Sequence, residues 1–203
     1  MDTLAYICHK YNIDISQPSP CYLAIGRFKD IPHLFHELGF KVGAEIGVYR
    51  GTYSRWLLRY CPGLKLYCVD SWTNYSGYND SKLEDMADVY KSAQENTKQY
   101  DCKLLKGQSN EIVKSFDDES LDFVFIDANH AYEYVVEDIA LWSQKVRKGG
   151  IVYGHDFDDY SNHETRWAEM NVMNAVVGWT KSYKIHPWFV TMNNKNRCWM
   201  YVK

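Results

Sequence analysis

A carboxylate and two glycines in the segment 42–51 form the first group of residues with the chemistry to bind a charged ligand. The segment is V-G-A-E-I-G-V-Y-R-G, so Glu45 comes shortly before Gly47 and Gly51. Glycine lets the backbone approach a ligand closely at Gly47 and enter a helix tightly at Gly51. A carboxylate at Glu45 suits a positively charged group, such as an ammonium or a sulfonium. An ordinary strand-to-helix turn is the alternative interpretation.

The glycine spacing argues against a dinucleotide site. That fingerprint needs G-x-G-x-x-G, whereas Gly43, Gly47 and Gly51 recur every fourth residue. Asp70 lies 23 residues after Gly47, at the end of a predicted strand. Its carboxylate can accept two hydrogen bonds from a ribose diol, and a turn or helix-cap role is the alternative. The preceding glycine turn favours the ribose role.

A histidine and an aspartate close together in the sequence are candidates for proton transfer. His130 follows Asp127 in the segment D-A-N-H-A-Y. An unperturbed imidazole has a pKa near ~6.5, so His130 can take the proton of an attacking hydroxyl group. It can equally be a metal ligand or a structural residue that opens the next helix. His155 likewise has two alternative interpretations, as a metal ligand and as a structural partner.

The elements that must position these side chains alternate along the chain. Predicted strands cover residues 41–46, 64–69, 102–105, 121–126, 151–154, 188–192 and 197–202. Predicted helices cover residues 31–38, 52–60, 81–97, 132–146 and 164–180. This order implies βαβ units and a mostly parallel sheet, whose ligands bind outside the carboxyl ends of the strands. We therefore expect Gly47, Asp70, Asp127 and Asp156 to lie along one edge.

The composition excludes several classes of protein. The chain has 203 residues, of which 46% are hydrophobic and 24% charged, as in a globular domain rather than a disordered one. A net charge of −3 without a basic run argues against nucleic acid as the main partner. No apolar stretch approaches a membrane span, and residues 1–12 do not resemble a signal peptide. The six cysteines form no C-x-x-C pair. We expect a cytoplasmic protein without a membrane partner.

Four segments in order carry a resemblance to a known family. They are E-I-G-V-Y-R-G, L-Y-C-V-D-S-W, F-V-F-I-D-A-N-H-A-Y and G-G-I-V-Y-G-H-D. Together they resemble class I S-adenosylmethionine-dependent methyltransferases. The likeness is greatest to the small bacterial branch related to macrolide-sugar O-methyltransferases of the macrocin and mycinamicin type. It covers about residues 30–203.

The resemblance implies a fold and a cofactor. The fold is a Rossmann-like, doubly wound α/β sheet of seven strands in the order 3-2-1-4-5-7-6, with an antiparallel last strand. A methyltransferase domain would span residues 31–203, preceded by an N-terminal arm of residues 1–30. The cofactor is S-adenosylmethionine, and its implied contacts are Glu45, Gly47, Gly51, Asp70, Ser71, Trp72, Gln108, Ser109 and Asp127. Trp72 would either pack beside the adenine or brace the loop.

The resemblance also implies a divalent metal, Mg²⁺ or Mn²⁺. Asp127 and Asp156 match the positions where related O-methyltransferases place metal carboxylates, and His155 is a third candidate ligand. Such an ion would lower the pKa of a substrate hydroxyl. A histidine ligand suits a softer ion such as Mn, Fe or Zn better than Mg²⁺. The predicted catalytic residues are His130 and Asp127. The alternative is a metal-free reaction with His130 as the sole base.

The predicted reaction is O-methylation of a hydroxyl on a small molecule or a glycan. Aromatic residues in loops 72–79 and 157–167, among them Tyr75, Tyr78, Tyr160 and Trp167, predict either a lid over the acceptor or a homodimer contact. The rival functions are a non-catalytic interaction module of the same fold and an NAD-binding oxidoreductase.

Overall fold

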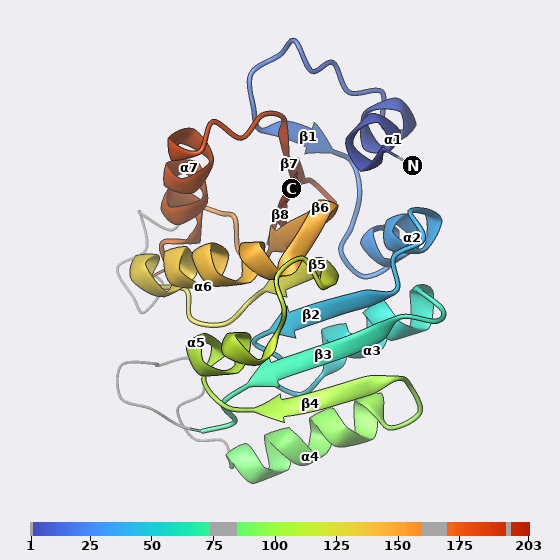
Figure 1. The fold of residues 1–203 in the computed structure, drawn as a ribbon, viewed down its shortest axis with the longest axis vertical. Helices are drawn as coiled ribbons and strands as arrows, with labels where there is room; N and C mark the ends of the chain where they lie inside the picture. The colour runs from blue at the N-terminus through green and yellow to red at the C-terminus, as the bar shows by residue number, and fades with distance from the viewer. Residues whose placement is uncertain (1, 74–84, 160–169, 194–195) are drawn as a thin grey trace.

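The computed structural model describes residues 2–73, 85–159, 170–193 and 196–203, which form one eight-stranded sheet. The strands follow the order β1-β7-β8-β6-β5-β2-β3-β4, with β1 at one end and β4 at the other (Figure 1). Strand β8 is antiparallel to β6 and β7, and the remaining neighbours are parallel. The strands are β1 (Cys21–Leu23), β2 (Val42–Ile46), β3 (Lys65–Asp70), β4 (Cys102–Lys106), β5 (Leu121–Ile126), β6 (Val146–Gly154), β7 (Trp188–Thr191) and β8 (Trp199–Val202).

Helices cover both faces of the sheet. They are α1 (Thr3–Lys10), α2 (Asp30–Glu37), α3 (Thr52–Tyr60), α4 (Met86–Thr97), α5 (Ser109–Ile112), α6 (Tyr132–Lys145) and α7 (Val172–Ser182), with a 3-10 turn η1 (Val113–Ser115) after α5. Buried side chains of α1 to α4 join one core cluster, and those of α6, α7 and η1 join the other. Each face of the sheet therefore has its own hydrophobic core.

Strand β5 explains how one short segment supplies both cores. Successive side chains of a strand point to opposite faces. Phe123 and Phe125 accordingly enter the core beside α2 and α3, whereas Val124 and Ile126 enter the core beside α6. All four are almost fully buried, as expected for a central strand of a parallel sheet.

The predicted fold class is confirmed, and the strand count is corrected from seven to eight. Without β1, the observed order is the predicted 3-2-1-4-5-7-6. The extra strand lies in the segment 1–30, which we expected as an arm, and it pairs in parallel with β7 through Cys21 and Phe189. Three residues are too short for a period-two pattern, so the sequence alone does not reveal this strand.

Strand β6 begins earlier than predicted. We expected Gly149 and Gly150 to end the preceding helix, but α6 ends at Lys145 and β6 continues directly from Val146 through both glycines. A Cβ on Gly150 would lie 2.5 Å from the Asp122 carbonyl oxygen, so this glycine allows β6 to approach β5 closely.

Some predictions fall outside the described residues. These are the helix start at Ser81, the first part of the helix predicted over 164–180, and the loop aromatics Tyr75, Tyr78, Tyr160 and Trp167. Helix α4 begins at Met86, where the Asp85 carboxylate accepts a hydrogen bond from the Ala87 amide. Among the described residues, no helix is long and apolar enough to span a bilayer.

Candidate active site

The turn between β2 and α3 requires glycine at position 47. Gly47 has φ +87°, in the left-handed region that favours glycine. A Cβ at this position would lie 2.1 Å from the Asp127 carbonyl oxygen. The Asp127 amide also donates to the Ile46 carbonyl at 2.8 Å. The glycine turn is therefore packed directly against the end of β5.

Glu45 and Gly51 lie behind this turn. The Glu45 side chain is 1% exposed and accepts a hydrogen bond from Ser54 of α3 at 2.5 Å. Burial raises the pKa of this carboxyl well above its usual value. A Cβ on Gly51 would lie 3.1 Å from the Ala93 Cα, so this glycine lets α3 pack against α4. Neither residue is among those that line the pocket described below.

Asp70 holds the same loop through its carboxylate. One oxygen accepts from the amides of Val48 and Tyr49, each at 2.9 Å, and the other accepts from the Trp72 amide at 2.8 Å. The Trp72 indole donates to the Tyr49 carbonyl at 2.9 Å and packs edge-on against Tyr90. Trp72 therefore braces the loop. A carboxylate has about four lone-pair sites, so Asp70 keeps room for a ligand hydroxyl.

A pocket of about 580 Å³ lies along these strand ends. This volume is within the usual range for a small-molecule site. Most of the predicted cofactor contacts line it, namely Gly47, Asp70, Ser71, Trp72, Gln108, Ser109 and Asp127. The lining also includes residues that the sequence analysis did not select, among them Asn129, Tyr134, Glu137 and Asp138.

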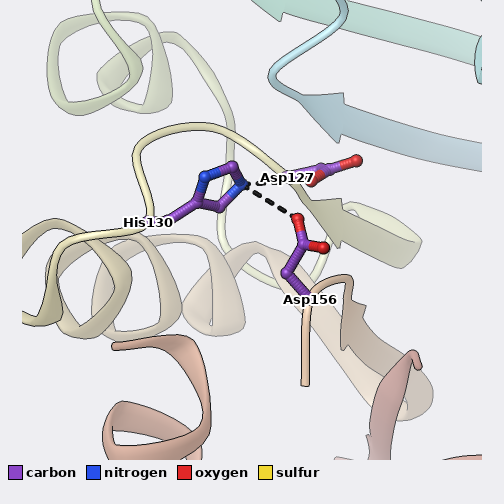
Figure 2. Close-up of side chains that lie close together, drawn as sticks. All are labelled: Asp127, His130 and Asp156. Atoms are coloured by element: carbon purple, nitrogen blue, oxygen red, sulfur yellow. Dashed lines mark hydrogen bonds and ion pairs between the residues drawn. The ribbon is translucent and has the colours of Figure 1, made fainter. Parts of the chain in front are cut away.

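Two aspartates and two histidines gather where β5 and β6 end. His130 Nε2 lies 3.2 Å from Asp156 Oδ2 and 3.4 Å from Asp127 Oδ1, and Figure 2 shows the ring directed at both carboxylates. His155 Nδ1 lies 3.1 Å from Asp156 Oδ2 and 3.7 Å from Asp127 Oδ1. We call these four residues the acid–histidine cluster. Asp127 belongs both to this cluster and to the pocket wall.

The acid–histidine cluster shifts the pKa values of an aspartate and a histidine in opposite directions. Burial opposes ionisation of Asp127, but hydrogen bonds from His130 and His155 outweigh it and hold the pKa of Asp127 well below its usual value. Burial likewise lowers the pKa of His155, yet its hydrogen bonds to Asp127 and Asp156 prevail and raise that pKa to about 9. Near neutral pH the cluster therefore contains an ionised Asp127 and a protonated His155.

The backbone at Asp156 is strained. This residue has φ +55°, a backbone angle that is uncommon for residues other than glycine. Asn196 donates to Asp156 Oδ1 at 2.7 Å, which leaves Oδ2 facing the two histidines. Such strain of about 1–3 kcal/mol concentrates at functional sites.

Arg27 is a site residue that the sequence analysis missed. Its Nη1 lies 3.6 Å from Asp127 Oδ2, and its guanidinium packs over the rings of Phe28 and Tyr53. It follows β1, in the segment that we expected as an arm. Asp127 lies 100 residues further along the chain, so no spacing rule joins the two residues. Only the fold brings them together.

The donor atoms of the cluster fit a divalent cation. Asp127, His130 and Asp156 each offer one ligand atom, and these atoms all lie within 4.8 Å of one another. A set of two carboxylate oxygens and one imidazole nitrogen suits Mn²⁺ better than Mg²⁺. His155 lies beside the same carboxylates. The roles assigned to individual residues in cofactor and metal binding stay predictions.

A buried carboxylate also lines the pocket away from the acid–histidine cluster. Asp138 of α6 is 5% exposed and accepts a hydrogen bond from the Ser109 hydroxyl. Ser109 Oγ in turn accepts from the Trp142 indole at 2.7 Å. Burial raises the pKa of Asp138 to about 7, and the nearby Glu137 adds to the rise. The sequence analysis selected Ser109 but not Asp138, because in the sequence Asp138 looks like any polar residue on the solvent face of an amphipathic helix.

Several solved structures with this fold are described as methyltransferases. An O-methyltransferase from Bacillus cereus, in complex with SAH, aligns with a TM-score of 0.62 and 18% identity over 100% of this chain and 91% of that chain. TomG from Streptomyces achromogenes, an O-methyltransferase of tomaymycin synthesis in complex with SAM, aligns with a TM-score of 0.60 and 16% identity over 100% of this chain and 90% of its own. Identities this low establish the fold alone.

Sequence comparison identifies the family. The uncharacterised protein R132 of Acanthamoeba polyphaga mimivirus is 33% identical over 70 residues, which cover 34% of this chain and 29% of that relative. This chain thus spans less than a third of that relative. The family model described as a methyltransferase domain matches residues 44–157, more than half of this chain and the part that runs from β2 past Asp156. The chain therefore belongs to the methyltransferase-domain family.

Proposed function

We propose that this protein transfers a methyl group from S-adenosylmethionine to a hydroxyl group of a small molecule or a glycan. The observation that carries the proposal is the double position of Asp127. This residue lines the pocket and also contacts His130 in the acid–histidine cluster. A cofactor in the pocket would therefore have a proton acceptor beside it.

His130 is the proposed general base. Its Nε2–H donates toward the carboxylates of Asp156 and Asp127, and this tautomer leaves Nδ1 as the basic nitrogen of the ring. The hydroxyl proton of the acceptor moves to His130 as its oxygen attacks the methyl carbon. The bond between the methyl carbon and sulfur breaks, and the sulfonium becomes the neutral thioether of S-adenosylhomocysteine. The two carboxylates stabilise the imidazolium that forms.

The rest of the site has a positioning role in this proposal. Methyl transfer needs the attacking oxygen, the methyl carbon and the sulfur in line, and it needs no covalent enzyme intermediate. Gly47 removes the side chain that would otherwise fill the space beside Asp127. Asp70 fixes the loop at Val48 and Tyr49 and offers its remaining lone pair to the ribose.

A divalent cation is the alternative to general-base catalysis by His130, because an imidazole that binds a metal ion through its acceptor nitrogen cannot also accept a proton. Asp127, His130 and Asp156 would hold it, and when bound it would act as a Lewis acid that makes the acceptor hydroxyl more acidic. Arg27, 3.6 Å from Asp127, carries a fixed positive charge that opposes a tightly bound ion. We propose weak binding of Mn²⁺ rather than a permanent metal centre.

The proposed acceptor class rests on the sequence likeness to macrolide-sugar O-methyltransferases. The structural relatives support an O-methyltransferase more generally, since the relatives from Bacillus cereus and Streptomyces achromogenes carry that description. A hydroxyl-rich acceptor fits the polar cluster, because its donors match the carboxylates.

Two measurements test the proposal. Isothermal titration of the purified protein with S-adenosylhomocysteine should give saturable binding, and NAD should give none. Radiolabelled S-adenosylmethionine should then methylate at least one member of a panel of sugars and phenols. His130→Ala should lose this transfer while it keeps S-adenosylhomocysteine binding. Binding without transfer to any acceptor would favour a non-catalytic interaction module, and binding of NAD alone would reject the proposal.

A further inference from the structure

Two cysteine side chains are in contact between β3 and β4, at one end of the sheet (Figure 1). Cys68 lies on β3 and Cys102 is the first residue of β4, and their sulfur atoms are 3.4 Å apart. Leu66 aligns with Cys102 and Cys68 aligns with Leu104, so the two cysteines are two residues out of register. Residues two apart on a strand point to the same face, and both thiols accordingly belong to the core beside α3 and α4.

Strand β4 can supply the movement that a disulfide requires. An S–S bond is about 2.05 Å long, so the two sulfur atoms have to approach by roughly 1.4 Å. In the described part of the chain β4 is an edge strand, with β3 beside it and no strand on its other side. A second ladder of hydrogen bonds therefore does not oppose a shift of β4 toward β3.

The two thiols differ in exposure and in acidity. Cys68 is fully buried, whereas Cys102 is partly exposed. Burial raises the pKa of Cys68 well above its usual value, so this thiol keeps its proton. The hydrogen bond from Cys68 lowers the pKa of Cys102 despite burial, and a hydrogen bond with Thr97 adds to the fall. A thiolate is the form of cysteine that attacks an oxidant, so Cys102 is the reactive thiol of the two.

The polar surroundings of Cys68 tolerate the loss of its proton. Glu45 Oε2 lies 3.9 Å from Cys68 Sγ and is the second acceptor within reach of the thiol. That oxygen also accepts a hydrogen bond from the Ser54 hydroxyl at 2.5 Å. Conversion of the thiol to a disulfide therefore leaves the buried Glu45 with a donor, and the usual cost of an unpaired buried acceptor does not arise.

We propose that Cys68 and Cys102 are a redox pair, which a hydroperoxide converts to a disulfide that ties β4 to β3. The Cys102 thiolate attacks a peroxide oxygen, the O–O bond breaks, and Cys102 becomes a sulfenic acid while the other oxygen leaves as water or an alcohol. The Cys68 sulfur then attacks the Cys102 sulfur, the S–O bond breaks, and the hydroxyl group leaves with the Cys68 proton as water. The two thiols lose two electrons in total, and the peroxide gains them.

This reaction goes beyond the proposed function and does not depend on it, because neither step uses a methyl donor or a methyl acceptor. The fully buried Cys68 needs no contact with the oxidant, since it reacts with the sulfenic acid beside it. Cys8 is a second partly exposed thiol, but burial raises its pKa, and Cys21 adds to the rise. Cys8 therefore serves as a comparison for Cys102.

The test locates the disulfide in the full-length protein. The reduced protein is treated with hydrogen peroxide at neutral pH, unfolded in N-ethylmaleimide and digested with trypsin. We expect alkylation of four of the six cysteines, because the other two form the disulfide. The tryptic peptides 66–82 and 99–103, which contain one cysteine each, should be joined. Dithiothreitol should separate them. A disulfide between any other pair, or alkylation of both Cys68 and Cys102, would overturn the inference.

Two variants separate the roles of the two thiols. Cys68→Ser keeps a hydroxyl donor near Glu45 and should stop at the sulfenic acid of Cys102, which dimedone labels. Cys102→Ser should leave Cys68 reduced, because the buried thiol cannot reach the peroxide. Dimedone labelling of Cys68 in Cys102→Ser would overturn the assignment of Cys102 as the reactive thiol. If neither variant folds, the peptide map of the wild-type protein still decides the inference.

Cys8→Ser is the matched control, because it removes the other partly exposed thiol and leaves the pair intact. It should form the same disulfide as the wild-type protein, and loss of the disulfide in this control would overturn the assignment to Cys68 and Cys102.

The effect on β4 is measured by thermal unfolding of the oxidised and the reduced protein. The disulfide joins residues 34 positions apart and restricts the unfolded chain. The midpoint of unfolding should therefore rise by roughly 5–15 °C on oxidation and return with dithiothreitol. A midpoint that does not rise would show that the disulfide does not tie β4 to β3.

Discussion

Two aspartates that line the pocket, the half-buried Asp127 and the buried Asp138, behave in opposite ways. Asp127 lies among His130, His155 and Arg27, and hydrogen bonds from the histidines hold its pKa well below the usual value despite burial. Asp138 has a serine hydroxyl and no cation among its described contacts, and burial raises its pKa to about 7. The same side chain is thus ionised at position 127 and half protonated near neutral pH at position 138.

This difference shows that the charge of each carboxyl group in the pocket depends on the side chains around it and not on the residue type. A pair of carboxylates whose pKa values are pushed apart is the pattern by which one site separates two tasks. Asp127 is suited to stabilise a cation during proton transfer, a task that Asp138 does not share.

The largest effect is expected beside Asp127. His130→Ala should slow methyl transfer by about 10²–10⁴-fold, because it removes the proposed base. Affinity for S-adenosylhomocysteine, measured by calorimetry, should change little, since His130 lies outside the pocket wall. A loss that is restored at higher pH agrees with a base, whereas an unchanged rate would assign His130 a structural role.

Asp138→Asn should alter the pH dependence of stability. A carboxyl whose pKa is raised on folding stabilises the protein at low pH, and this contribution is lost as pH rises from about 4 to about 7. Asn does not titrate, so the variant should gain up to about 4 kcal/mol relative to the wild-type protein over this range. Thermal unfolding at pH 4.5 and pH 8 measures the change, and parallel curves would contradict it.

His155→Gln should show its effect in a different pH range. A histidine whose pKa is raised to about 9 contributes stability that is complete below about 6.5 and is lost as pH rises through about 9. The variant should be less stable by up to about 3 kcal/mol at pH 6. Chemical denaturation should show a smaller difference in the free energy of unfolding at pH 9.5 than at pH 6. The same difference at both pH values would mean that the variant loses packing contacts rather than a charge interaction.

Asp70→Ala examines the middle of the pocket. The variant should weaken S-adenosylhomocysteine binding by about 1–3 kcal/mol, because it removes an acceptor for the ribose and three hydrogen bonds to the loop. Calorimetry gives the affinity. Asp118→Ala, at an exposed carboxylate that pairs with Lys145 outside the pocket wall, serves as the control and should bind as well as the wild-type protein.

The smallest effect on stability is expected for Arg27→Gln. The partly exposed ion pair with Asp127 should be worth about 0–1 kcal/mol. Removal of its charge should nevertheless tighten Mn²⁺ binding, measured by calorimetry with the metal alone. Arg27→Lys keeps the charge and should bind Mn²⁺ like the wild-type protein. Equal Mn²⁺ affinities in all three proteins would show that the charge of Arg27 does not affect metal binding.

Much of the fold follows from local patterns. The apolar run Leu121–Ile126 and the alternation of strands with helices predict a parallel sheet, and the predicted strand order is confirmed apart from β1. Strand β1 has three residues and pairs with β7 from the far end of the chain. Neither length nor periodicity marks such a segment, so the count of seven strands was wrong.

The candidate site was predictable where residues end strands. Gly47, Asp70 and Asp127 were selected because carboxyl ends of parallel strands meet at one edge, and all three line the pocket. Glu45 and Gly51 belong to the same motif but lie behind the turn, against Ser54 and Ala93. A motif gives the order of its residues along the chain, whereas the direction of each side chain depends on the pleat and on the packed helix.

The sequence alone determines which residues can do chemistry and on which strand ends they lie, because period and spacing are local properties of the chain. The tertiary structure decides the charge of each carboxyl. It brings Arg27 to Asp127 across 100 residues and buries Asp138 beside Ser109 across 29. Electrostatic interactions and desolvation depend on distance in space, which separation along the chain does not specify.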